Sequence, residues 1–171
     1  VGLNFIDVYE RTGLYPNALP SGLGREGAGV VEALGAGVRG LEVGERVAYV
    51  SSLAGSYAER RCMAADRLVT IPDGVSDRLA AAAMLKGLTA QFLLRRTHRV
   101  RKGDVVVIHA AAGGVGLIAA QWARHLGATV IGVVGSEAKA EFARGHGCHH
   151  TLILGRDDLS VKVRELTGGK G

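Results

Sequence analysis

Three glycines between an apolar run and a helical pattern constrain this chain more than any other feature. Residues 105–108 read Val-Val-Val-Ile, then come Gly113, Gly114 and Gly116, and a helical pattern occupies roughly residues 115–126. A short β-branched run predicts a buried strand. Glycines where such a strand turns into a helix allow the backbone to approach a ligand closely. The sequence therefore predicts the strand–turn–helix start of a nucleotide-binding sheet.

The glycines have the spacing G-x-G-x-x-G, with Ala111 in the place of the first glycine. In that motif Gly113 allows close approach to a pyrophosphate, and Gly116 allows the helix to pack closely on the strand. The predicted helix begins at Val115, where N–H groups and a partial positive charge favour an anion. We predict a dinucleotide site here, and the alternative is a tight turn that binds no ligand.

The next predicted strand, residues 129–134, is followed by Gly135 and Ser136 rather than by an acid. In dinucleotide folds a carboxylate about 20 residues after the glycines holds the ribose 2′-hydroxyl. A carboxylate in place of Ser136 would repel a 2′-phosphate, and Glu137 follows at a helix start, where an acid is favourable. Lys139 lies one helical turn on and could reach such a phosphate. This pattern favours NADP(H) over NAD(H), unless Lys139 is only a surface lysine.

The character of the chain changes near residue 76. Before it, short strand-like segments separated by turns predict a small barrel-like β domain. After it, helical and strand-like segments alternate, which predicts a parallel sheet with helices on both faces. The expected strands are residues 27–34, 46–50, 57–62, 68–71, 105–108, 129–134 and 151–154. The expected helices are residues 77–85, capped by Ser76, and residues 88–96, 115–126, 137–145 and 157–166.

Both parts of the chain read as incomplete. The sequence opens at Val1 on a strand-like segment, and three parallel strands make only half of a doubly wound fold. We therefore expect a β domain over residues 1–85 and a nucleotide-binding domain over residues 86–171, with more chain on either side.

The composition is that of a globular protein with an excess of positive charge. The 171 residues carry a net charge of +5, which favours an anionic partner such as a phosphorylated cofactor or a nucleic acid. The densest basic segment, residues 95–102, has no interleaved aromatic residues, so we predict a solvated helix end there. Two cysteines and the lack of a signal pattern or membrane-length apolar run predict a cytoplasmic location without membrane association.

Three features with histidine or cysteine could suggest a metal or catalytic site, and we predict a structural role for each. His146, His149 and His150 surround a cysteine in HGCHH, but adjacent residues alternate faces, so we expect a surface loop and no metal site. Cys62 is expected to be half-buried in a strand and not catalytic. His109 is expected to end its strand by packing.

Several longer stretches carry a resemblance to a known family. NFIDVYERTGLYP (4–16), LPSGLGREGAGVVEALGAGV (19–38) and AAGGVG (111–116) resemble the zinc-free quinone oxidoreductases of the medium-chain dehydrogenase/reductase superfamily, to which zeta-crystallin belongs. The likeness extends to IPDGVS, LKGLTAQFLLR and ELTGGKG. It implies an α/β protein, with a GroES-like β-barrel portion followed by a partial Rossmann domain.

The resemblance also implies that this member lacks zinc. Alcohol-dehydrogenating relatives place a zinc-binding Cys in G-x-C-x-x-D and a His in G-H-E-x-x-G. Asn4 and Arg25 stand at these positions here, and neither is a suitable zinc ligand. Arg25 is expected to meet a carbonyl oxygen or to pair with Glu26. The sequence has no set of four closely spaced cysteines for a structural zinc.

The resemblance implies functional residues at the positions of this chain that match the family's motifs. Asn4, Asp7 and Tyr15 would line the nicotinamide and substrate cleft, Tyr15 by bonding a substrate oxygen or, alternatively, by packing as an aromatic. Asp7 has the alternative role of capping a helix or orienting a loop. The cofactor residues implied are Asn4, Thr89 near the nicotinamide, Gly113, Gly114, Val115 and Gly116 at the pyrophosphate, and Ser136 and Lys139 at the 2′-phosphate.

The expected function is NADPH-dependent reduction of a quinone. Without zinc to stabilise an alkoxide, hydride delivery to an electron-poor acceptor is the easier reaction. Reduction of an enone, enal or enoyl-thioester is the alternative within enzymes, and nucleic-acid binding or a crystallin-like structural role is the non-enzymatic one. The favoured partners are a quinone or enone and, for the full-length protein, a second copy in a homodimer, with no nucleic acid.

One position departs from the family pattern. Relatives often carry Asn-Tyr at the end of the third parallel strand, with the Tyr near the cofactor phosphate. Ile153 and Leu154 stand there in this chain. The departure implies a weaker clamp on the 2′-phosphate.

Overall fold

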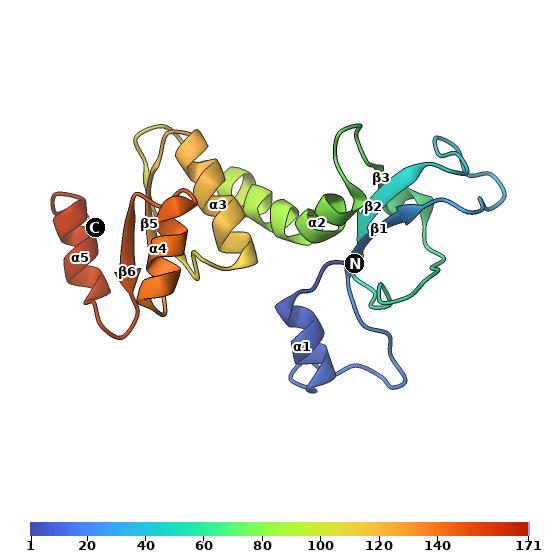
Figure 1. Ribbon diagram of the computed structural model, residues 1–171, viewed down its shortest axis with the longest axis horizontal. Coiled ribbons are helices and arrows are strands. Elements are labelled where there is room, and N and C mark those ends of the chain that lie inside the picture. The colour runs from blue at the N-terminus through green and yellow to red at the C-terminus, as the bar shows by residue number, and fades with distance from the viewer. Residues whose placement is uncertain (171) are drawn as a thin grey trace. The chain divides into compact units, whose positions relative to one another are not determined.

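The computed structural model describes residues 1–170 and divides into two compact units, one covering Val1–Leu85 and a second that begins at Lys86 (Figure 1). The boundary falls within helix α2 (Asp77–Gln91), which Ser76 caps by accepting a hydrogen bond from Leu79 N–H at 3.2 Å. The sequence predicted two helices here, and this is wrong. The helix continues through Gly87, because a lone glycine costs only about 1 kcal/mol relative to alanine, and runs into a π-helical segment, η2 (Phe92–Thr97).

The first unit is built on a three-stranded antiparallel sheet. Its strands are β1 (Glu26–Val30), β2 (Arg46–Val50) and β3 (Leu68–Thr70), in the order β1-β2-β3, with a short 3-10 turn, η1 (Ala65–Arg67), before the last. Ala48 pairs with Ala28 on one side and Val69 on the other. The buried residues Ala48, Ile71 and Ala80 form a small core.

Two sequence predictions for this unit are wrong. The first residues form a helix, α1 (Phe5–Arg11), rather than a strand, because Asn4 and Asp7 satisfy each other's backbone groups at its start. Residues 57–62 are not a strand either. The Tyr57 N–H donates to the Leu23 carbonyl at 2.9 Å, so this segment bonds to a loop rather than to the sheet.

The second unit contains a parallel three-stranded sheet flanked by helices. Strands β4 (Val105–His109), β5 (Thr129–Val134) and β6 (His150–Ile153) lie in the order β4-β5-β6. Helices α3 (Gly114–His125), α4 (Glu137–Gly145) and α5 (Leu159–Leu166) alternate with them along the chain. The predicted fold class, an antiparallel β portion followed by part of a doubly wound parallel sheet, is confirmed (Figure 1).

The side chains of β5 alternate between its two faces, and different helices cover these faces. Val130 and Val134 pack in one cluster with alanines of α3 and α4, among them Ala120 and Ala143. Ile131 and Val133 point the other way, where Leu159 and Val163 of α5 cover them. Successive strand residues face opposite sides of a sheet, so β5 is buried on both.

The outer strand β4 is less covered, and its odd positions are exposed. Val105 and Val107 are exposed, as is His109, so the prediction that His109 packs at its strand end is wrong. Cys62 is likewise exposed rather than half-buried. In the HGCHH segment His149 Nδ1 accepts a hydrogen bond from Val130 N–H at 3.0 Å, and burial raises the pKa of the Cys148 thiol.

The center of the sheet has no room for a side chain at Gly132. A Cβ there would lie 2.6 Å from Cys148 Sγ and 2.8 Å from the Ala111 Cβ. We expect Gly132→Ala to lower the free energy of unfolding by about 1–3 kcal/mol through overpacking, measured by chemical denaturation. Removing the sulfur in Gly132→Ala/Cys148→Ala should restore part of the loss.

The matched control for this prediction is Gly135→Ala at the end of the same strand. A Cβ at Gly135 meets no atom within 4 Å, so this change should leave stability nearly unchanged. Equal stability of the Gly132 and Gly135 variants would contradict the predicted close contact.

Candidate functional site

The glycine turn between β4 and α3 is shaped by one backbone carbonyl. Ala110 has a left-handed backbone, with φ 51°, and its carbonyl accepts a hydrogen bond from Gly113 N–H at 2.8 Å. A Cβ at Gly116 would lie 2.4 Å from that oxygen and 2.7 Å from Ala111 Cα. Both neighbours are backbone atoms, so only glycine allows α3 to lie this close to the turn.

Gly113 and Gly114 are exposed, unlike Gly116. A Cβ at Gly113 would meet the Ala110 carbonyl oxygen at 3.1 Å, and one at Gly114 would lie 2.7 Å from Lys86 Cδ. The first N–H groups of α3 have no acceptor within the helix. The turn therefore presents bare backbone and a helix start to the surface, an arrangement that suits a phosphate.

Lys86 is the residue that sequence reasoning missed at this turn. It belongs to α2, far from the glycines in the sequence, and its alkyl chain lies against Gly114. Thr89, which the family motif did single out, lies one turn further along the same helix and is partly buried. Only the stretch LKGLT could have drawn attention to Lys86, and nothing in it predicted contact with the turn.

The two residues predicted to bind the 2′-phosphate lie close together after the end of β5. Ser136 caps α4, because its Oγ accepts a hydrogen bond from Lys139 N–H at 3.4 Å. Both side chains are exposed. Glu137 lies between them in the sequence and binds Arg156, with Nη1 to Oε2 at 2.7 Å. The structure thus places a serine, a lysine and a paired carboxylate at this strand end.

In the first unit, Asn4 and Asp7 form the start of α1. Asn4 N–H donates to Asp7 Oδ2 at 2.9 Å, so Asp7 does cap the helix, the simpler of its two predicted roles. Asp7 is 3% exposed, and among residues 1–170 its Oδ1 has no hydrogen-bond partner. The Tyr57 hydroxyl donates to Oδ2 at 3.1 Å, a contact that the sequence did not predict.

Glu26 is a fully buried carboxylate beside this helix start. Its Oε1 accepts a hydrogen bond from Asn4 Nδ2 at 2.7 Å, and its Oε2 accepts one from Leu85 N–H at 2.6 Å. A Cβ at Gly2 would lie 2.2 Å from Oε1. Asn4 is therefore fixed by a buried acceptor, which orients its amide.

Arg25 does not pair with Glu26, so that expectation is wrong. Its guanidinium donates to Glu10 Oε1 from Nε at 2.9 Å and from Nη2, and to the carbonyl oxygen of Ser52 from Nη1. The alternative expectation, a functional contact with a carbonyl oxygen in the place of zinc, stays a prediction, because the carbonyl bound here is the backbone of Ser52. Both positions where relatives carry zinc ligands are thus occupied by side chains bound to carboxylates of α1 and β1.

Tyr15 follows α1, and its ring packs against that of Tyr9. Its ring lies 5.3 Å from that of Tyr9, and its N–H donates to the Tyr9 carbonyl at 3.1 Å. The side chain is 51% exposed, so its hydroxyl remains accessible. Asn4, Asp7 and Tyr15 therefore belong to one local structure built on α1 (Figure 1).

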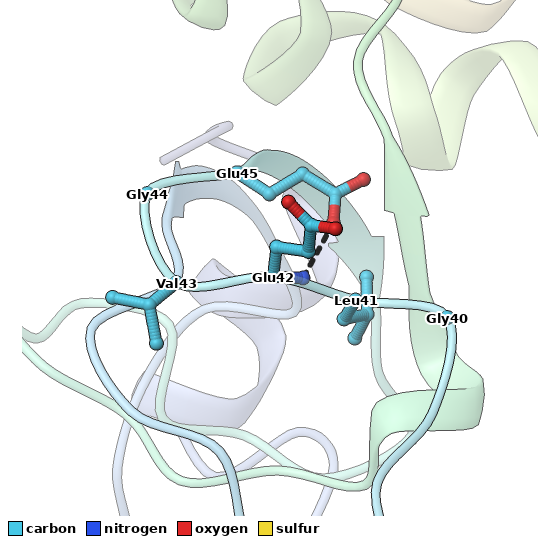
Figure 2. A pocket seen from close by; sticks show the side chains of 6 residues that line it. All are labelled: Gly40, Leu41, Glu42, Val43, Gly44 and Glu45. Atoms are coloured by element: carbon cyan, nitrogen blue, oxygen red, sulfur yellow. Dashed lines mark hydrogen bonds between the residues drawn. The ribbon is translucent and has the colours of Figure 1, made fainter.

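A separate hollow lies in the turn between β1 and β2. Figure 2 shows Glu42 N–H donating to Glu45 Oε2, at 3.0 Å. The hydrogen bond from the Thr70 hydroxyl is the main cause that lowers the pKa of the Glu45 carboxyl. The hollow is lined by Gly40, Leu41, Glu42, Val43, Gly44 and Glu45, none of which is a candidate binding residue.

The described residues contain neither a cluster suited to a metal ion nor a helix suited to spanning a membrane. Residues 1–170 contain no group of three or more His, Cys, Asp or Glu side chains that could hold a metal ion. Within the same range no helix has both the length and the apolar character needed to span a bilayer.

Comparison with known proteins agrees with both units. The alcohol dehydrogenase GroES-like domain matches residues 1–73, and the zinc-binding dehydrogenase domain matches residues 114–171. A quinone oxidoreductase of Pseudomonas aeruginosa is 53% identical over 171 residues, which are 99% of this chain and 53% of that protein. A 2-haloacrylate reductase of Burkholderia is 49% identical over 178 residues, covering 100% of this chain and 53% of that protein.

A solved structure of a quinone oxidoreductase has the same fold as this chain. The crystal structure of Escherichia coli quinone oxidoreductase complexed with NADPH superposes with a TM-score of 0.96 at 46% identity, covering 99% of this chain and 52% of that one. The chain belongs to the medium-chain dehydrogenase/reductase superfamily, and its relatives there include the quinone oxidoreductases. It spans about half the length of the curated relatives it matches.

The Tyr57–Asp7 contact predicts a pH dependence. Partial burial, followed by the hydrogen bond to the Asp7 carboxylate and its charge, raises the pKa of the Tyr57 phenol above its ordinary value of 10.0. A group with a raised pKa in the folded state contributes stability below its unfolded pKa and loses it as the pH rises through the folded pKa. We therefore expect the free energy of unfolding to fall above about pH 10.

Urea denaturation between pH 8 and pH 11.5 measures this fall, and absorbance at 295 nm follows phenolate formation. In Tyr57→Phe the Tyr57 part of the alkaline fall should be missing, together with the phenolate absorbance that Tyr57 contributes. Tyr49→Phe, which removes a phenol from strand β2 instead, is the matched control. A Tyr57→Phe profile that parallels the wild type would show that the contact is absent in solution.

Proposed function

We propose that the full-length protein containing this chain is an NADPH-dependent quinone reductase that works without zinc. The observation that carries the proposal is the glycine turn, where α3 starts against bare backbone at Gly113 and Gly114. Both glycines are exposed, and a diphosphate at a turn of this type needs close approach to bare backbone. Supporting it are relatives named quinone oxidoreductases and a structure of one complexed with NADPH.

The residues of this chain divide the work of holding the cofactor. Gly113, Gly114, Val115 and Gly116 would hold the pyrophosphate at the positive end of α3. Ser136 and Lys139 would bind the 2′-phosphate, because both are exposed at the end of β5. Thr89 would contact the nicotinamide part, and we place the boundary between catalytic and cofactor domains at residues 85 and 86.

The chemistry that bound NADPH supplies is hydride transfer. The chain's contribution is orientation and the exclusion of water. Asn4, fixed by Glu26 at 2.7 Å, would present its amide to the nicotinamide or substrate. Tyr15 would donate a hydrogen bond to a substrate oxygen, and the buried Asp7 would hold the start of α1 beside Asn4.

A quinone suits such a site because its reduced oxygens are stabilised by the aromatic ring and take protons readily from water. A second candidate substrate class is supported by one comparison, the 2-haloacrylate reductase at 49% identity. An activated alkene, such as an enone, enal or haloacrylate, demands more of a proton donor, a role that Tyr15 would have to fill. Assembly as a homodimer remains a prediction.

The direct test is NADPH oxidation by the full-length protein with 1,2- and 1,4-quinones, with simple enones and with 2-haloacrylates. The proposal expects turnover with quinones and a preference for NADPH over NADH. Turnover confined to activated alkenes would favour the second candidate. Absence of binding to either nucleotide would refute both.

Substitution at the glycine turn separates binding from folding. Gly113 has an extended backbone, φ −86° and ψ 171°, which any residue adopts, and a Cβ there would meet the Ala110 carbonyl oxygen at 3.1 Å, so a small loss of stability is expected. We expect Gly113→Val to weaken NADPH binding by more than about tenfold, by filling the space for the diphosphate, and to shift the melting temperature by only a few degrees.

Fluorescence titration and thermal unfolding measure these two effects. Gly145→Ala at the end of α4, where a Cβ meets no atom within 4 Å, is the matched control and should change neither. Unchanged NADPH affinity in Gly113→Val would remove the main support for the proposed function.

A further inference from the structure

The carboxylate that follows the phosphate-binding serine is held in an ion-pair cluster. Glu137 Oε2 accepts a hydrogen bond from Arg156 Nη1 at 2.7 Å, and Glu137 Oε1 lies 3.6 Å from Arg144 Nη2. Arg144 also donates to the Thr151 hydroxyl at 2.6 Å. Two guanidinium groups therefore face one carboxylate, one residue beyond Ser136.

Arg156 is held in place from its other side by a fixed acid. Asp157 Oδ2 accepts a hydrogen bond from Ile153 N–H at 2.7 Å, which ties it to the end of β6. Its Oδ1 accepts one from Arg156 Nε at 3.1 Å. Arg156 thus bridges the end of β6 and the start of α4, and α4 follows the strand end that holds a ribose in this type of fold.

Pairing shifts the pKa values of the charged groups in this cluster. The hydrogen bond from Arg156 is the main cause that lowers the pKa of the Glu137 carboxyl, and the bonds to Asp157 and Glu137 raise the pKa of Arg156. The side chains of Glu137 and Arg156 are 65% and 58% exposed. Exposed ion pairs contribute little to stability, so substitution of Arg156 should leave the fold intact.

We propose that Arg156 is a specificity-determining residue that offsets the charge of Glu137 and so allows a cofactor with a 2′-phosphate to bind at the end of β5. The inference rests on the proposed function and deepens it. An unpaired carboxylate one residue after Ser136 would repel the phosphate and favour a free ribose hydroxyl. At the β6 end, Ile153 and Leu154 offer no polar side chain, and the first polar side chain after them is Arg156.

The test compares Arg156→Gln, Glu137→Gln and the double variant in the full-length protein. Dissociation constants for NADPH and NADH come from fluorescence titration, and competition by 2′,5′-ADP against 5′-AMP isolates the 2′-phosphate. Arg60→Gln, which breaks the exposed Arg60–Glu32 pair of the first unit, is the matched control. Thermal unfolding checks that each variant is folded.

We expect Arg156→Gln to weaken NADPH and 2′,5′-ADP by about five- to tenfold at low salt, as repulsion between two exposed anions predicts. NADH and 5′-AMP should change less than about twofold, within the range of a lost surface contact. The double variant should bind NADPH nearly as well as the wild type, because the repelling charge is gone. In Arg60→Gln all four affinities should stay as in the wild type.

Two results would overturn the inference while leaving the proposed function intact. One is an unchanged preference for NADPH in Arg156→Gln. The other is a double variant as weak as Arg156→Gln, which would mean that Glu137 is not what Arg156 offsets. Wild-type protein that binds neither NADPH nor NADH would refute the proposed function, and this inference with it.

Discussion

The second unit of this chain depends on a contact of backbone with backbone. Helix α3 starts so close to Ala110 and Ala111 that a single added carbon at Gly116 would lie 2.4 Å from a carbonyl oxygen. That closeness lets the alanines of α3 reach the sheet and bury β5. It also leaves Gly113 and Gly114 exposed at the positive end of the helix. Core packing and the anion site thus follow from the same missing side chain.

In the other unit, side chains bound to carboxylates occupy the positions that carry zinc in related dehydrogenases. Asn4 binds the buried Glu26, and Arg25 binds Glu10. A buried carboxylate without hydrogen-bond partners is costly, and these two donors provide partners. The hydrogen bonds therefore tie Asn4 at the start of α1, and Glu10 near its end, to the residues at the start of β1.

The sequence predicted the second unit better than the first, for a physical reason. Strand and helix periods there are uninterrupted, so the strand at residues 129–134 and the helix at 137–145 were predicted with their observed bounds. In the first unit, α1 depends on a reciprocal contact between Asn4 and Asp7. The bonds of Tyr57 go to a distant loop. The ion pair of Glu137 and Arg156 joins residues 19 apart, and no local pattern indicates such a pairing.

The left-handed backbone at Ala110 has a consequence for how a ligand meets the turn. An alanine rarely adopts φ 51°, and the fold holds it there through the hydrogen bond from Gly113 and through α3. The shape of the turn is accordingly set by the chain itself. If the turn holds a nucleotide as proposed, association would involve little loss of chain entropy at this point.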